Sequence, residues 1–133
     1  MVIISAFIDK VKIIYGAISG LPDDNECFHD PAIDLTWVEM CGGPYGGVYN
    51  GFSEVLENVF NRIGADWEDF KFNPAVFHVF GDVVAVEGDY TGINRNTGKT
   101  INARVIHLWK LTDGKIKFEQ FTDTAIFWEA IKS

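Results

Sequence analysis

The segment NARVIHLWKLTDGKIKFEQFTDT, residues 102–124, predicts two antiparallel strands joined by a tight turn. Asp113-Gly114, between two runs of alternating apolar residues, is the strongest short-range signal for a β-hairpin. Side chains of a strand alternate between two faces, so the odd-numbered residues of the first run share one face: Ala103, Val105, His107, Trp109 and Leu111. An imidazole and an indole among apolar neighbours fit the wall of a small-molecule pocket, and they fit an ordinary core equally well.

The composition indicates one globular domain spanning residues 1–133. The chain is 47% hydrophobic and 14% aromatic, which excludes a disordered protein. Its formal net charge of −8 argues against nucleic acid and against an anionic membrane surface, because both partners require a basic face. We therefore expect neither kind of partner.

The cellular compartment is predicted from the start of the chain and from its cysteines. The first ten residues, MVIISAFIDK, lack a basic leader and a small-residue cleavage site. The apolar runs are much shorter than the ~20 residues that span a bilayer. Cys27 and Cys41 are the only cysteines, and without a secretory signal they are expected to be free thiols. These features predict a cytoplasmic protein.

The order of predicted elements indicates an α+β fold. Apolar spacing predicts a helix over residues 4–18, a short helix from Pro22, and a helix over 52–63 capped by Ser53. Alternation predicts a strand over 33–39 and, after a glycine-rich loop at 41–47, four strands at about 70–80, 83–93, 99–111 and 115–124. The last four strands read as an antiparallel meander with helices on one face.

Four motifs resemble the SnoaL-like branch of the NTF2-like superfamily, which is related to the ketosteroid isomerases: WKLTDGKI (109–116), QFTDTA (120–125), YGAISG (15–20) and PYGGVYNG (44–51). The resemblance covers the whole chain. It implies a cone, in which a curved, mostly antiparallel sheet wraps around three N-terminal-side helices and encloses an apolar cavity. It also implies a homodimer formed through the sheet. The superfamily includes steroid isomerases, polyketide cyclases, epoxide hydrolases, dehydratases and non-catalytic binding modules, so the fold alone does not give the function.

Individual positions discriminate between these activities. The epoxide-hydrolase relatives carry an arginine and an aspartate, two residues apart, on the strand that here reads VEGDY (86–90). Gly88 and Tyr90 occupy those places, and the second aspartate falls on Gln120 or Phe121. The resemblance therefore argues against epoxide hydrolysis. In the steroid-isomerase relatives the base is a carboxylate at the end of the first strand, a place best matched by Glu39.

Glu39, His107 and Tyr90 are the candidate catalytic residues. A carboxylate at an apolar cavity mouth loses hydration, so its pKa rises and it can shuttle protons near neutral pH. His107 is a candidate donor to a carbonyl or partner of Glu39, and Tyr90 is a candidate donor to an oxyanion. The alternatives are a solvated glutamate at a loop edge and a histidine hydrogen-bonded within the core.

The candidate ligand-binding residues are Trp37, Trp109, Val105, Gln120 and Asp123. The two indoles would supply flat apolar walls for a ring-shaped ligand, although core packing explains them equally well. Asp123 matches an aspartate that is frequent near the end of the last strand in similar sequences. Its alternative role is to fix the C-terminal segment.

No metal and no organic cofactor is predicted. Cys27 and His29 lack a second ligand pair at a useful spacing. Gly98-Lys99-Thr100 resembles the end of a phosphate loop, but Ile93 stands where the first glycine is required.

Two functions remain open at this point, both using a small hydrophobic molecule. One is a cyclase or isomerase that applies acid–base chemistry to a hydrophobic carbonyl compound. The other is a non-catalytic module that binds a small apolar ligand. A purely structural dimerisation domain would instead fill the cavity with its own side chains.

Overall fold

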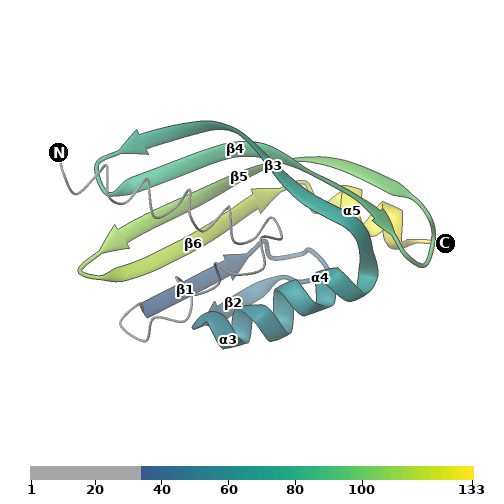
Figure 1. The fold of residues 1–133 in the computed structure, drawn as a ribbon, viewed down its shortest axis with the longest axis horizontal. Coiled ribbons are helices and arrows are strands. Elements are labelled where there is room, and N and C mark those ends of the chain that lie inside the picture. The colour runs from purple at the N-terminus through teal and green to yellow at the C-terminus, as the bar shows by residue number, and fades with distance from the viewer. Residues whose placement is uncertain (1–33) are drawn as a thin grey trace.

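A curved sheet of six strands is the frame of the protein in the computed structural model, which describes residues 34–133 (Figure 1). The strand order is β2-β1-β6-β5-β4-β3. All neighbours pair antiparallel except β1 and β6, which are parallel. The strands are β1 (Asp34–Glu39), β2 (Gly47–Asn50), β3 (Trp67–Phe80), β4 (Val83–Asn94), β5 (Thr100–Thr112) and β6 (Lys115–Thr122).

One helical segment lies along the concave side of the sheet and a second follows the last strand (Figure 1). The first consists of α3 (Phe52–Val55), a π-helical turn η1 (Leu56–Phe60) and α4 (Asn61–Asp66). Its Val55 and Val59 are buried, as an amphipathic helix packed on a sheet requires. The second is α5 (Thr124–Ile131).

The predicted meander is confirmed, because its hairpins are specified locally. Asp113 and Gly114 both have positive φ, 49° and 77°, as the favoured two-residue hairpin turn demands. The predicted helix is also present, but Gly51 stands at its N-cap in place of Ser53 and it continues past Gly64 to Asp66. The strand expected to reach residue 124 ends at Thr122. β2 and α5 were not predicted.

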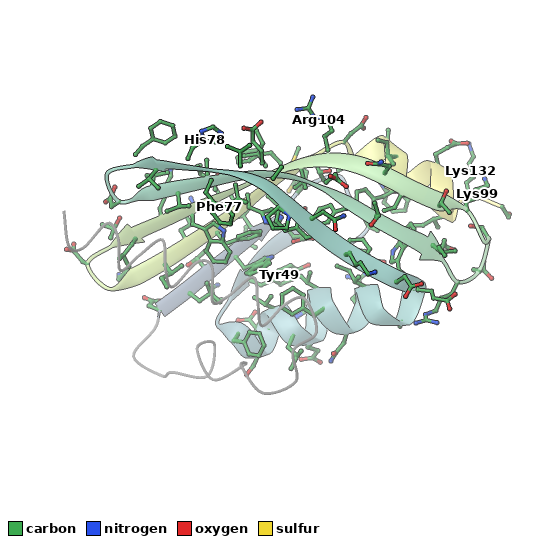
Figure 2. All side chains as sticks on the ribbon, turned by 45° about the horizontal axis from the view of Figure 1, so that its top comes forward. Tyr49, Phe77, His78, Lys99, Arg104 and Lys132 are labelled. Carbon is green, nitrogen blue, oxygen red and sulfur yellow. The ribbon has the colours of Figure 1, made fainter. Side chains whose placement is uncertain are left out.

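The core occupies the face of the sheet turned toward the helix. Figure 2 shows Tyr49 and Phe77 between the sheet and the helix, and His78 and Arg104 projecting from the opposite face. Two buried clusters fill this side. One is built around Trp37, Trp109 and Phe118, and the other around Trp67, Tyr90 and Phe127. The site described below lies where these clusters meet.

The helices predicted at 4–18 and from Pro22 lie outside the described residues, as do Cys27 and His29. Within residues 34–133, no helix is both long and apolar enough to cross a lipid bilayer.

Candidate functional site

The parallel pairing of β1 and β6 brings together two polar side chains that are far apart in sequence. Val38 lies opposite Glu119 in this pair, so the following residues, Glu39 and Gln120, are neighbours at the end of the ladder. In the adjacent pair of β5 and β6, Gln120 lies opposite His107. The sheet register alone thus places a carboxylate, a carboxamide and an imidazole side by side on the concave face.

These side chains form a continuous hydrogen-bonded chain with Tyr90 of β4. Gln120 Nε2 donates to Tyr90 Oη over 2.7 Å, and Tyr90 Oη lies 2.5 Å from His107 Nε2. The Gln120 side chain also hydrogen-bonds to Glu39. All four residues are buried. Buried polar groups require partners, and each of these groups has them within the site.

Two further donors bind Glu39 and Gln120. Trp37 Nε1 donates to Glu39 Oε1 over 2.9 Å, and the backbone N–H of Met40 donates to Gln120 Oε1 over 3.1 Å. The Met40 bond identifies Oε1 as the amide oxygen, because a backbone N–H requires an acceptor. Nε2 is then the donor to Tyr90, so the phenol proton points to His107 Nε2.

The imidazole of His107 is neutral in this arrangement. An Nε2 atom that accepts from a phenol leaves the ring proton on Nδ1. Burial lowers the pKa of His107 from 6.5 to about 3, because a charged ring would lose its hydration. The hydrogen-bond pattern and the electrostatics therefore agree on the neutral form at physiological pH.

Glu39 is poised to exchange a proton near neutral pH. Burial raises its pKa from 4.5 to about 7, and the hydrogen bonds from Trp37 and Gln120 oppose that rise. Only 5% of the residue is exposed. Its charged and neutral forms are therefore both accessible at pH 7, as a general base requires.

A small cavity of about 20 Å³ adjoins this network. Such a volume holds about one water molecule. Its polar walls include Glu39, Tyr90 and Gln120, and its cover consists of the loop at 40–46 and the start of α5. The remaining wall is apolar and includes Ile63, Phe70 and Phe127.

The other residues predicted to bind ligand lie behind or beside this cavity. Trp37 stacks on Phe118 with 3.8 Å between ring centroids, and Trp109 meets Trp37 edge-on at 6.0 Å. Val105 is buried in the second core cluster. Of the candidate catalytic and ligand-binding residues, Glu39, Tyr90 and Gln120 line the cavity, whereas Trp37, His107 and Trp109 are not part of its lining.

Asp123 lies at the N-terminus of α5. Its Oδ1 accepts a hydrogen bond from the backbone N–H of Ala125 over 3.1 Å, which makes it the N-cap of the helix. This contact accounts for Asp123 as a residue that fixes the C-terminal segment.

Tyr45 is a residue of the cavity wall that sequence reasoning missed. Its hydroxyl donates to Asp66 Oδ2 over 2.7 Å and accepts from Trp67 Nε1 over 2.9 Å. Burial raises its pKa above its ordinary value, and the bond to Asp66 adds to the rise. The sequence signal that would have identified Tyr45 is its position as the single aromatic residue of the glycine-rich loop. An aromatic side chain anchors a loop that has little other side-chain packing.

Gly88, at the place where the epoxide-hydrolase relatives carry an arginine, has no room for a side chain. A Cβ atom at this position would lie 2.7 Å from the ring of Phe72 and would also meet the Asn73 carbonyl. The Phe72 ring stacks on His107 with 4.2 Å between centroids. An aromatic ring thus occupies the space above His107 that a long side chain at position 88 would need.

Comparison with known proteins agrees with this architecture. The SnoaL-like domain family matches residues 25–119. An NTF2-like protein from Burkholderia thailandensis is 38% identical with a TM-score of 0.80, over 93% of this chain and 98% of its own. No curated protein matches the sequence significantly.

Two more distant structures share the fold. TerC, crystallised with polyporic acid, is 24% identical with a TM-score of 0.80, over 96% of this chain and 98% of its own. A Catenulispora acidiphila protein with a ketosteroid isomerase-like fold, in complex with trimethylamine, is 17% identical with a TM-score of 0.73. The match covers 91% of this chain and 90% of that protein. The family match covers more than half of the sequence, and the six-stranded curved sheet fits it. The chain therefore belongs to the SnoaL-like family of the NTF2-like superfamily.

Proposed function

We propose that the protein is a cofactor-independent isomerase or cyclase acting on a small, hydrophobic carbonyl compound. The observation that carries the proposal is Glu39, a buried carboxyl whose pKa is raised to about 7 and which shares a cavity with Tyr90 and Gln120. Perturbed carboxyls in a concave apolar site are typical of general bases.

The proposed reaction begins with proton transfer from carbon. Glu39, as the carboxylate, takes the proton from the carbon next to the carbonyl, and the electrons of the broken C–H bond form an enolate. The Tyr90 hydroxyl, turning from His107 to the substrate, donates a hydrogen bond to the enolate oxygen. In an isomerisation of a β,γ-unsaturated carbonyl compound, Glu39 then returns the proton to the γ-carbon of the dienolate, and the double bond moves into conjugation. In a cyclisation, the enolate carbon bonds to a second carbonyl carbon, whose C=O π electrons move to its oxygen, and that alkoxide takes the proton back from Glu39. A positioned base and a hydrogen-bond donor suffice for either outcome.

Substrate entry requires the cavity to widen. A volume of about 20 Å³ does not accept a carbonyl compound of several carbon atoms. The sheet wall is held by its ladders, so the loop at 40–46 and α5 are the parts of the wall that would move.

Deuterium exchange tests the proposal directly. We would incubate the protein in D₂O with a panel of cyclic ketones that includes 2-tetralone, and follow loss of the α-proton signal by NMR. Glu39→Gln is expected to reduce the exchange rate at least about 100-fold, which is the usual contribution of a general base. Glu119→Gln is the matched control, because Glu119 is a carboxylate of the neighbouring strand that pairs with Lys117. Equal rates for wild type and Glu39→Gln, or no exchange with any ketone, would contradict the proposal.

A non-catalytic binding module is the second candidate. The small cavity and the replacement of the hydrolytic arginine and aspartate by Gly88 and Tyr90 favour it. It predicts that members of the same ketone panel bind, as judged by chemical-shift changes around Tyr90, without exchanging their α-protons.

We further propose that the chain forms a homodimer through the convex face of the sheet. A row of side chains crosses four strands there in register, namely Val76, Glu87, Ile106 and Phe121. Its three apolar members are between 44% and 45% exposed. An apolar row on an open sheet face is a feature of association surfaces.

A further inference from the structure

We infer that Gln120 is the positioning residue of the site, coupling Glu39 to the Tyr90–His107 pair and fixing the direction of the hydrogen bonds between them. The effect of Gln120 on catalysis rests on the function proposed above. Its effect on Glu39 and on the Tyr90–His107 pair is independent of that function, because it follows from the contacts of the resting protein.

The carboxamide of Gln120 has one permitted orientation. Met40, whose backbone N–H donates to Oε1, directly follows Glu39 in the chain. A flipped amide would place its NH₂ group against this N–H, so two donors would face each other. The backbone at the end of β1 therefore fixes the Gln120 amide, and the same stretch of backbone carries Glu39.

The fixed amide determines where the proton of Tyr90 points. Because Gln120 Nε2 donates to Tyr90 Oη, the phenol donates to His107 Nε2. An amide of the opposite orientation would draw the phenol proton to itself and away from His107. Gln120 thus maintains the resting state in which the Tyr90 hydroxyl donates to His107 Nε2.

The same amide also acts on Glu39. Its hydrogen bond stabilises the carboxylate and opposes the effect of burial. The other titratable groups of the described residues that face this site are Tyr90 of β4, His107 of β5 and Tyr45 of the loop. Burial lowers the pKa of His107 and raises the pKa of Tyr45, so both of these groups are neutral at neutral pH. Gln120 and Trp37 are therefore the groups that keep Glu39 ionisable near pH 7.

The test is an NMR titration of Gln120→Leu with labelled Glu and His side chains. We expect the titration midpoint of the Glu39 carboxyl to rise by about one pH unit, since a hydrogen bond to the charged form is lost. We also expect the ¹⁵N resonance of His107 Nε2 to move, although leucine at position 120 leaves the ring itself unchanged. Glu119→Gln, one residue away, is expected to leave both signals at their wild-type positions.

Two companion variants keep the test decisive. Should Gln120→Leu fail to fold, Gln120→Glu retains an acceptor for Met40 and puts a second carboxyl beside Glu39, which should raise the Glu39 midpoint further. Tyr90→Phe should move the His107 resonance while changing the Glu39 midpoint by less than Gln120→Leu does.

The outcomes separate this inference from the proposed function. Wild-type values for both signals in a folded Gln120 variant would overturn the inference, whether or not ketones are exchanged. Shifts in both signals, together with a wild type that exchanges no ketone, would support the positioning role and contradict the enzymatic proposal.

Discussion

Glu39 and His107 are two buried titratable groups whose pKa values are shifted in opposite directions. Folding raises the pKa of Glu39 from 4.5 to about 7, so the native state binds more protons between these values and stability falls as pH rises. Folding lowers the pKa of His107 from 6.5 to about 3, so the unfolded state binds more protons and stability rises with pH. The two contributions oppose each other between pH 4.5 and 6.5.

Removing the Glu39 carboxyl should reveal how much it contributes to the pH dependence of stability. We expect Glu39→Gln to gain stability relative to wild type as pH rises, with the difference in unfolding free energy widening by about 3 kcal/mol between pH 4 and 8. The reason is that wild type must bury a carboxylate above its folded pKa, whereas the amide never ionises. Urea unfolding at a series of pH values measures the difference. A constant difference across the range would show that Glu39 titrates normally.

Gly88 is the residue that permits Phe72 to stack on His107. Gly88→Ala should destabilise the protein by about 1–3 kcal/mol, because the new Cβ overlaps the Phe72 ring and the Asn73 backbone. Gly64→Ala is the matched control, since a Cβ there meets nothing within 4 Å in a helix and should stabilise by up to about 1 kcal/mol. Thermal unfolding of both variants gives the comparison. A harmless Gly88→Ala would mean that both the Phe72 ring and the Asn73 backbone move aside at little cost.

At the scale of elements, the cover of the site is held together by α5. Trp128 Nε1 donates to the Gly42 carbonyl over 2.6 Å. The far end of the helix is tied to the β4–β5 turn, where Thr97 Oγ1 donates to the Ala130 carbonyl over 2.6 Å. The glycine-rich loop is thus attached to a helix that is itself attached to the sheet.

An engineered disulfide between the loop and α5 should lock this cover. A Cβ at Gly43 would lie 3.9 Å from Thr124 Cβ, which suits a disulfide. In a Cys27→Ser/Cys41→Ser background, oxidised Gly43→Cys/Thr124→Cys should gain up to about 4 kcal/mol of stability from closure of the long loop. It should also bind and exchange ketones more slowly, and dithiothreitol should restore the rate.

The reduced form of the same variant is the control for the substitutions themselves. Entry as fast in the oxidised as in the reduced protein would show that ligands reach Glu39 by another route.

At the scale of the whole molecule, the parts of the fold that were predictable are those encoded by neighbouring residues. The Asp113-Gly114 turn and the alternation around it specify the β5–β6 hairpin without help from the rest of the chain. β2 is a four-residue edge strand, too short to show a clear alternation, and α5 is held by contacts with the distant residues Gly42 and Thr97. The site was predictable as a set of candidate residues. The position of Gln120 between Glu39 and Tyr90 was not, because it depends on a parallel pairing between residues about 80 positions apart.

The convex face of the sheet yields a prediction about assembly. Phe121→Asp should convert a dimer to a monomer in sedimentation velocity, because a buried carboxylate in an apolar interface is costly. Val48→Asp is the control, since Val48 is 58% exposed but lies on β2, at the far edge of the sheet from β3. A monomeric wild type, or a dimer that survives Phe121→Asp, would contradict association through this face.

The parallel pairing of β1 with β6 also determines when the site can form during synthesis. β1 is made early, yet its partner is the last strand to leave the ribosome, and long-range parallel pairing is slow. Until then one edge of β1 stays open and Glu39 remains hydrated, with an ordinary affinity for protons. Glu39 therefore acquires its raised pKa only after β6 has been made, and a chain shortened before Lys115 would keep every residue of β1 without the strand that pairs beside this carboxyl.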